Sequence, residues 1–346
     1  MEKKRKIVTV LSADSLLNEQ WEKLYALRKI ITEMRNEKWC ISDIESLKKI
    51  VERQFQNNDK YSFLILENNK EFEGIVELVL NEIDTANEHL FIRPFFMIPE
   101  RPYWIIKEVA NIVMKFHDSK NEIYIDTFDD SGDWFAHEIG GELRNQFFNL
   151  KYFIHSHSHL YYERHYKEIM NINNGFTITV CSSIPEELLL AYFELYSNVS
   201  TEENLHFNNV ECRESFEEFL IRESYRQSSR DDYIYCMVFN SEKNLVGITV
   251  DCVEKNINLR QEITGVHPIY RGRGFGLMMK HCAYAYIREN YPLVDEVTTV
   301  IAEENLWMIK INKKLGFNIF RVDKRYSVDN QVLYALCNEY VDTTKT

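Results

Sequence analysis

The sequence predicts an α+β protein made of two units that repeat one order of strands and helices. The length of 346 residues is too great for one compact mixed domain and sufficient for two. Apolar periodicity then gives one series twice: a strand, two helices, a hairpin, a strand, a helix, a strand and a helix. We therefore expect domains at 1–160 and 175–346 and a linker at 161–174.

The elements of the first half follow from periodicity and from turn residues. We expect, in order, a strand at 6–11, helices at 16–37 and 43–55, a hairpin at 61–82, a strand at 89–98, a helix at 102–119, a strand at 122–128 and a helix at 132–148. Asn68 and Asn69 mark the hairpin turn, and Pro102 suits the first turn of a helix. Gly140 and Gly141 disturb the last helix.

The second half gives the same order. We expect, in order, a strand at 175–182, helices at 185–198 and 213–227, a hairpin at 233–254, a strand at 258–266, a helix at 276–290, a strand at 296–302 and a helix at 305–317. Pro185 opens the first of these helices, and Gly316 caps the last one at its C-terminal end.

The composition is that of an ordinary globular chain, and the net charge is −13. Binding to nucleic acid requires a basic surface, so we expect no nucleic-acid partner. The acidity suits a cationic or amine-bearing small molecule, although many enzymes are acidic for solubility alone. No window approaches 18 apolar residues, and the N-terminus has no long apolar stretch, so we expect no membrane span and no signal peptide.

Seven cysteines are scattered along the chain without a C-x-x-C pair. Unpaired cysteines of odd number fit a reducing compartment, so we expect a cytoplasmic protein. His155, His157 and His159 alternate, and on a strand they would share one face. They suit either a metal site or a polar connector; since no carboxylate or cysteine stands beside them at ligand spacing, we expect no metal.

A glycine-rich turn separates the strand at 258–266 from the helix that follows it. It reads Arg271-Gly272-Arg273-Gly274-Phe275-Gly276. Glycines let a backbone pass close to phosphate oxygens, and N–H groups at a helix N-terminus attract a diphosphate. Arg271 and Arg273 supply charge or stack on the ligand. The spacing excludes a Walker loop, which needs Gly-Lys-Ser/Thr, and the G-x-G-x-x-G dinucleotide fingerprint.

The stretch from Thr264 to Gly276 resembles the acetyl-coenzyme A signature R/Q-x-x-G-x-G/A of the GNAT N-acetyltransferase superfamily. The stretch at 302–317, "AEENLWMIKINKKLGF", is similar to the family's N-x-x-M-x-x-x-N-x-x-L-G-F helix. The repeated order of elements resembles tandem GNAT proteins of the mycothiol-synthase type. The resemblance implies two GNAT-like domains, each a mixed, mostly antiparallel sheet flanked by helices, with acetyl-coenzyme A as co-substrate.

The resemblance also implies a set of cofactor contacts. The strand before the glycine turn would splay from its neighbour, and the pantetheine arm would pair with the backbone of Thr264, Gly265 and Val266. The Val266 N–H would polarise the thioester carbonyl. The pyrophosphate would be held by the N–H groups of Arg271, Gly272, Arg273, Gly274, Phe275 and Gly276. Asn305 would bond the pantetheine side of the cofactor, and Lys310, Lys313 and Lys314 suit either its 3′-phosphate or a solvated helix face.

Glu262 is the candidate catalytic residue. It stands two residues before Thr264, so on a regular strand both side chains point the same way. Glu262 is then either a base that deprotonates the acceptor amine, directly or through water, or a surface glutamate. Many family members have a tyrosine as general acid four residues before the Gly of "LGF". Here Asn312 stands there and cannot act as an acid, so the general acid is unassigned.

The equivalent stretch of the first half, at 91–110, has no glycine between strand and helix. Pro99, Pro102, Tyr103 and Trp104 occupy the turn, and proline has no N–H to donate. We expect a degenerate GNAT-like domain that packs against the second and shapes the acceptor pocket; the competing interpretation is an unrelated domain of similar element order.

The predicted function is transfer of an acetyl group from acetyl-coenzyme A to a primary amine of a small molecule or peptide, by direct attack. The alternatives are a coenzyme A-binding sensor or scaffold without catalysis, and an acyltransferase with a different acyl donor or acceptor. The acceptor and the oligomeric state cannot be read from the residues.

Overall fold

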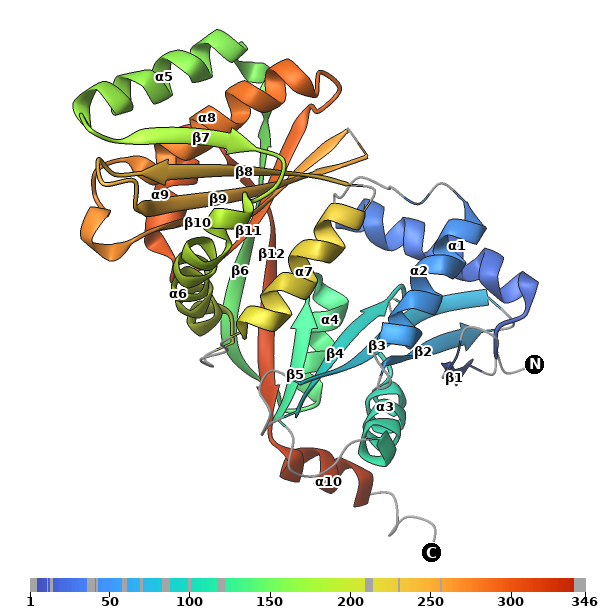
Figure 1. The fold of residues 1–346 in the computed structure, drawn as a ribbon. Coiled ribbons are helices and arrows are strands. Elements are labelled where there is room, and N and C mark those ends of the chain that lie inside the picture. The colour runs from blue at the N-terminus through green and yellow to red at the C-terminus, as the bar shows by residue number, and fades with distance from the viewer. Residues whose placement is uncertain are drawn as a thin grey trace, which may run out of the picture. The chain divides into compact units, whose positions relative to one another are not determined.

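A computed structural model gives the fold of the chain (Figure 1). It describes residues 5–10, 12, 15–35, 41, 43–57, 61–68, 71–82, 88–98, 101–116, 122–208, 214–229, 231–255 and 257–338. Predicted features at 11, 36–37, 40, 69, 99, 117–119 and 209–213 lie outside these ranges. None of the described helices is long and apolar enough to cross a membrane.

Two compact units form, and their limits differ from the predicted domains. The first unit is Met1–Phe147 together with Arg321–Thr346, and the second is Phe148–Phe320. The final segment therefore belongs to the first unit, because the strand that contains Arg321 pairs with a strand of that unit. Most of the predicted linker is a helix of the second unit, at His159–Ile172.

The elements of the first unit agree in order with the prediction up to its last helix. They are β1 (Arg5–Val10), α1 (Asn18–Met34), α2 (Ile44–Asn57), β2 (Tyr61–Asn68), β3 (Glu71–Glu82), β4 (Glu88–Phe96), α3 (Tyr103–Phe116), β5 (Glu122–Thr127), α4 (Asp130–Glu138), the start of β6 (Glu142–Phe153), most of β12 (Asn318–Val328) and α10 (Asn330–Asn338). Leu24 and Val51 are buried between the sheet and α1 and α2, whereas Val109, Phe135 and Leu333 belong to a second core under α3, α4 and α10.

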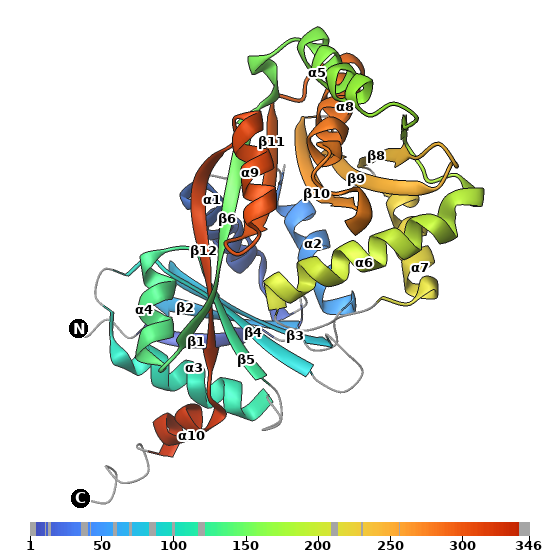
Figure 2. The same cartoon turned by 90° about the vertical axis from the view of Figure 1, so that its left-hand side faces the viewer.

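The elements of the second unit repeat this order. They are the end of β6, the 3₁₀ turn η2 (Ile154–Ser156), α5 (His159–Ile172), β7 (Thr177–Cys181), η3 (Glu186–Leu188), α6 (Leu189–Asn208), α7 (Phe216–Ser228), β8 (Asp232–Phe239), β9 (Leu245–Glu254), β10 (Asn258–Val266), η4 (Pro268–Tyr270), α8 (Phe275–Asn290), β11 (Glu296–Ala302) and α9 (Leu306–Leu315). Helices α5 and α8 lie side by side (Figures 1 and 2). One core joins α5, α8 and α9 to the sheet, and a separate core joins α6 and α7 to it.

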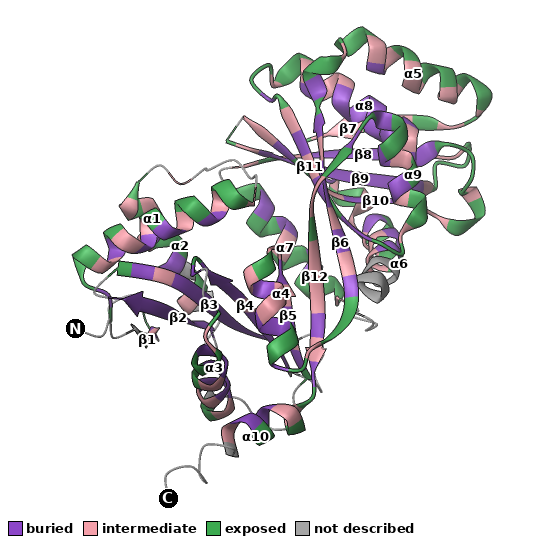
Figure 3. Ribbon diagram, turned by 180° about the vertical axis from the view of Figure 1, so that it is seen from behind, coloured by how far each residue is buried: buried purple, intermediate pink, exposed green. Residues whose placement is uncertain are grey.

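The described strands form one mixed sheet in the order β1-β2-β3-β4-β5-β12-β6-β11-β10-β9-β8-β7. Parallel pairing joins β4 to β5 and β10 to β11, while the hairpins β2–β3 and β8–β9 are antiparallel. The buried residues follow the strands and the inner helix faces (Figure 3). The α+β class is confirmed. Strand order alone does not divide the chain in two, since the sheet has a single series of twelve strands.

The helix predicted at 132–148 is wrong in its second half. Helix α4 ends at Glu138, Gly140 takes a left-handed φ of 78°, and β6 starts at Glu142. A left-handed residue ends a helix because it turns the chain out of the α region. The buried positions of β6 include Asn145 and Asn149, so its polar side chains hide the alternation expected of a strand.

Candidate active site

The edge of β10 opens toward its neighbour β11 over the last part of the strand. β10 pairs with β9 along its whole length, but its parallel pairing with β11 covers only Asn258 to Arg260. The His267 N–H donates to the Val246 carbonyl of β9 at 2.9 Å. Because N–H groups alternate between the two edges of a strand, those of Thr264 and Val266 point away from β9. The splay implied by the resemblance is therefore present in the described strands.

A β-bulge between Gln261 and Ile263 changes which face each side chain occupies. Before the bulge, Leu259 lies in the core shared with α8; after it, Ile263 lies in the core shared with α6 and α7. Glu262 reaches Arg226 of α7, whereas the Thr264 hydroxyl contacts the Thr249 hydroxyl at 2.8 Å, beside α8. The expectation that Glu262 and Thr264 point the same way is therefore wrong, because a bulge adds one residue to the alternation.

The glycine turn ends in a helix N-terminus that has no side-chain cap. Gly272 and Gly274 have φ angles of 81° and 86°, in the left-handed region that favours glycine. Gly274 is the N-cap residue of α8, and as a glycine it has no side chain to accept a hydrogen bond from the first turn. The turn from Arg271 to Gly274 is exposed, so the first N–H groups of α8 are open to an anion.

Two other glycines near this turn, Gly276 and Gly265, lie in tightly packed positions. A Cβ at Gly276 would lie 3.1 Å from Ile311 Cδ1 of α9, whereas one at Gly272 would meet nothing within 4 Å. Gly265 lies against Val199 of α6. The small residues thus bring α8, α9 and α6 close to the opened edge of β10, and Gly272 leaves the approach to the turn clear.

The two arginines of the turn have different surroundings. Arg271 Nε–H donates to the Val266 carbonyl at 3.0 Å, on the edge of β10 that faces away from β9. The Arg273 guanidinium lies 5.8 Å from the ring centre of Phe176 and 5.6 Å from that of Tyr270. Both arginines are exposed, so they add positive charge at the mouth of the α8 N-terminus.

Glu262 is held by two arginines. Arg226 donates to Oε2, and Arg260 Nη1 lies 2.8 Å from Oε1. Arg226 is buried and also donates to Glu223, which accepts a 2.5 Å hydrogen bond from the Tyr235 hydroxyl. Both oxygens of Glu262 thus face guanidinium groups, which fix the position of the carboxylate on the α7 side of β10.

A buried polar cluster that sequence reasoning missed lies on the α8 side of β10. It comprises Asp251, Gln261, Lys280, Tyr284 and Asn312, all buried. Lys280 donates to the Gln261 side-chain oxygen and, at 2.5 Å, to Asn312 Oδ1. Burial raises the pKa of Asp251 to about 7, against the lowering effect of Lys280. The available signal was a lysine within the apolar run "FGLMMKHCAYAYI", where a charge is costly unless partnered.

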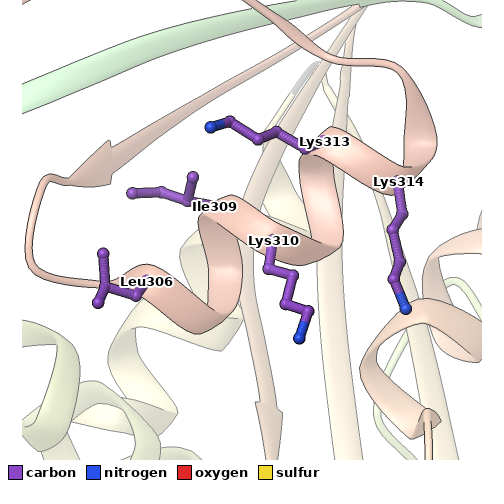
Figure 4. Close-up of a pocket in the computed structure, with 5 residues that line it drawn as sticks. All are labelled: Leu306, Ile309, Lys310, Lys313 and Lys314. Atoms are coloured by element: carbon purple, nitrogen blue, oxygen red, sulfur yellow. The ribbon is translucent and has the colours of Figure 1, made fainter.

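Asn305 and the lysines of α9 are not members of this cluster. The Asn305 side chain caps α9, since its Oδ1 accepts from the Met308 N–H at 3.2 Å. A hollow of about 500 Å³ lies along α9 (Figure 4), lined by Leu306, Ile309, Lys310, Lys313 and Lys314. Lys310 and Lys314 point to one side of the helix and Lys313 to the other (Figure 4). The three ammonium groups therefore do not converge on one point.

The three alternating histidines do not lie on a strand. His155 is in η2, His157 follows it, and His159 starts α5, because Ser158 caps that helix. The His157 ring stacks on Tyr161 at 3.8 Å between centroids, and Tyr161 lies beside His165 at 4.1 Å. Across the described ranges, no three His, Cys, Asp or Glu side chains gather at metal-binding distance.

The corresponding region of the first unit is filled by aromatic side chains. At the end of β4, Phe95 stacks on Phe128 and Phe96 packs edge-on against Trp134. The Phe96 N–H donates to Ser131 Oγ at 3.0 Å. Pro102 precedes α3, whose first turn contains Tyr103. This end of β4 therefore lacks the small residues that expose the helix N-terminus in the second unit.

Several solved structures resemble this chain in fold. A tandem GNAT protein from the clavulanic acid biosynthesis pathway, solved without AcCoA, gives a TM-score of 0.64 at 14% identity over 94% of this chain and 99% of that chain. A GCN5-related N-acetyltransferase from Sphaerobacter thermophilus gives 0.62 at 11% identity, over 93% and 95%. The glucosamine N-acetyltransferase region of a fungal multi-domain GH3 β-N-acetylglucosaminidase gives 0.59 at 10% identity, over 94% of this chain and 38% of that chain.

The chain therefore has the GNAT N-acetyltransferase fold. Its match to the tandem GNAT protein over nearly the full length of both chains shows the tandem form of that fold. No protein-family model and no curated protein matches the sequence. At identities of 10 to 14%, the likeness establishes the fold alone.

Proposed function

We propose that the second unit transfers an acetyl group from acetyl-coenzyme A to a primary amine of a small molecule or peptide. The observation that carries this proposal is the opened edge of β10 next to the uncapped N-terminus of α8. Together they offer a row of backbone groups for an extended arm and a positive helix end for a diphosphate.

Different residues at this edge bind different parts of acetyl-coenzyme A. The N–H groups from Arg271 to Gly276 hold the pyrophosphate, and Arg271 and Arg273 add charge. The backbone of Thr264 to Val266 pairs with the pantetheine arm, because these residues extend beyond the ladder with β11. The Val266 N–H, which points away from β9, polarises the thioester carbonyl and stabilises the negative charge that forms there.

Proton removal from the acceptor amine is the proposed role of Glu262. Its carboxylate lies on the α6 and α7 side of β10, opposite the Thr264 side chain. The ion pairs with Arg226 and Arg260 hold the carboxylate in place, and a water between it and the amine carries the proton. Asn305, whose oxygen caps α9, has its Nδ2 group left to donate to the pantetheine side.

The second candidate is a coenzyme A-binding sensor or scaffold without catalysis. The observation that favours it is the pairing of both Glu262 oxygens with arginines, which occupies the atoms that would accept the proton of the amine. An acyltransferase with another acyl donor keeps the same binding roles. In each case, the first unit is proposed as a degenerate GNAT-like domain.

Two measurements on the full chain test the proposal. Calorimetry should detect binding of acetyl-coenzyme A, and a panel of primary amines should give amine-dependent release of coenzyme A thiol. Binding without thiol release from any amine would favour the sensor. An absence of binding would refute the proposed site and both candidates with it.

A further inference from the structure

The buried polar cluster is centred on the Lys280 ammonium. Lys280 is 1% exposed and Asn312 is fully buried, and the two are joined by the 2.5 Å hydrogen bond from Nζ to Oδ1. Gln261 accepts from the same ammonium and donates from Nε2 to Asp251 at 3.4 Å and to Tyr284 at 3.3 Å. An apolar core does not need such a cluster, because burying charged groups opposes folding unless each is well partnered.

The cluster lies directly behind the opened edge of β10. Gln261 is the first residue after the ladder with β11 stops at Arg260. Its main-chain carbonyl accepts from the Thr299 hydroxyl of β11 at 3.3 Å. Along α8, Gly276 lies near Thr264, and Lys280 is one helical turn further on, beside Gln261. The ammonium therefore stands beyond the phosphate end of the opening, where the far end of an extended arm would reach.

Two polar atoms of this cluster have no hydrogen-bond partner within the described part of the chain. They are Asn312 Nδ2, a donor, and Asp251 Oδ2, an acceptor, and both residues are fully buried. An unsatisfied buried polar group costs about 1–3 kcal/mol, so such groups normally have a partner. The Asn312 donor adjoins the Lys280 ammonium, and together they suit an electron-rich, negatively charged atom.

We infer that Lys280 and Asn312 form the site that receives the sulfur atom of coenzyme A when the thioester is cleaved. The inference rests on the proposed function. As the acceptor nitrogen bonds to the thioester carbonyl carbon, the carbon–sulfur bond breaks and its electron pair remains on sulfur. The Lys280 ammonium and the Asn312 amide N–H donate hydrogen bonds to that thiolate. The proton of the amine goes to Glu262 or water, and the thiolate takes its proton from water on release.

In this assignment, Lys280 and Asn312 take the place of the general acid that the sequence leaves unassigned. An amide cannot protonate a thiolate, but a buried ammonium stabilises it without proton transfer. Asp251 of β9 and Lys280 attract each other, Tyr284 of α8 meets Gln261, and Glu262 lies on the opposite face of β10. Burial raises the pKa of Asp251 to about 7, which limits how far that carboxylate neutralises the ammonium near neutral pH.

The test is the ionisation of the coenzyme A thiol in its complex with the full chain. Thiolate absorbance is followed against pH, and the spectrum of the complex with desulfo-coenzyme A is subtracted, because protein cysteines and tyrosines also titrate. In the wild type, the pKa of the bound thiol should be lower than that of free coenzyme A by about one unit or more. Lys280→Met should return it to the free value, and Lys167→Met, at an exposed position of α5, should leave it lowered.

A second variant covers the case in which Lys280→Met does not fold. Asn312→Asp is isosteric and places a carboxylate beside the ammonium, so the pKa of the bound thiol should rise toward the free value. An unchanged thiol pKa in either folded variant overturns the inference, and so does a wild-type complex whose thiol titrates like free coenzyme A. These outcomes leave coenzyme A binding intact, whereas failure of the wild type to bind coenzyme A refutes the proposed function itself.

Discussion

Gly265 of β10 lies so close to Val199 of α6 that a Cβ added at position 265 would be 2.2 Å from Val199 Cγ2. No side-chain atom fits at that distance, so only glycine permits this approach of helix and strand. The contact lies on the opened part of β10, between Thr264 and Val266. Val199 belongs to the core of α6 and α7, which therefore fixes one wall of the proposed site.

Gly265→Ala should destabilise the protein by about 1–3 kcal/mol, as overpacking of a core usually does. Val199→Ala removes the obstructing methyl groups, so the double variant Gly265→Ala/Val199→Ala should be more stable than the sum of the two single changes predicts. Urea unfolding of the four proteins measures this coupling. Additive changes would show that the two residues are not in contact.

Gly274→Glu should weaken coenzyme A binding by more than about 100-fold, because its carboxylate would stand among the N–H groups that hold the pyrophosphate. The matched control is Gly274→Ala, which carries the strain of the left-handed φ of 86°, about 1–2 kcal/mol, without the charge. Calorimetry compares the two. Equal affinity of the glutamate variant and the wild type would remove α8 from the binding site.

Glu262→Gln should lower turnover by about 100-fold or more and leave coenzyme A affinity unchanged, since a glutamine cannot accept the proton of the amine. Arg260→Gln is the control, because it removes one of the two ion pairs of Glu262 and keeps the carboxylate. The turnover of the two variants is compared in steady-state assays with the best amine of the panel. If both variants lose turnover equally, the ion pair rather than the base explains the effect.

Asp251→Asn should change how stability depends on pH. Burial raises the pKa of Asp251 from 3.8 to about 7, so between these values the folded state holds a proton that the unfolded state has lost. The free energy of unfolding then falls as pH rises through this window, by up to about 1.4 kcal/mol per pH unit for this group. Asparagine removes this contribution.

The contribution of Asp251 is read from the difference between variant and wild type, measured by urea unfolding at several pH values. A difference is needed because His281 changes the free energy of unfolding in the opposite sense. Burial lowers the pKa of His281 to about 4, so its contribution to the free energy of unfolding is lost as the pH falls. Parallel pH profiles of the two proteins would mean that Asp251 is ionised in the folded state, paired with Lys280.

Local chemistry determined much of the fold and the location of the site. The two hairpins could be predicted because each strand pair is joined by a short turn. The end of α9 at Gly316 was predicted as well, and Gly316 has a left-handed φ of 92°. The turn from Arg271 to Gly276 was predicted from its glycines, and Gly272 and Gly274 do take left-handed φ angles. These are properties of neighbouring residues, and they hold whatever the rest of the chain does.

Tertiary structure alone decided β6, α5, β12 and the bulge in β10. Strand β6 buries Asn145 and Asn149, so its sequence lacks the apolar alternation by which a strand is recognised. The bulge separates Glu262 from Thr264, and it depends on how β10 pairs with β9. Lys280 and Asn312, the buried pair that joins α8 to α9, are 32 residues apart in the chain. Contacts between distant segments arise only when the chain is packed, and for this reason no local pattern announced them.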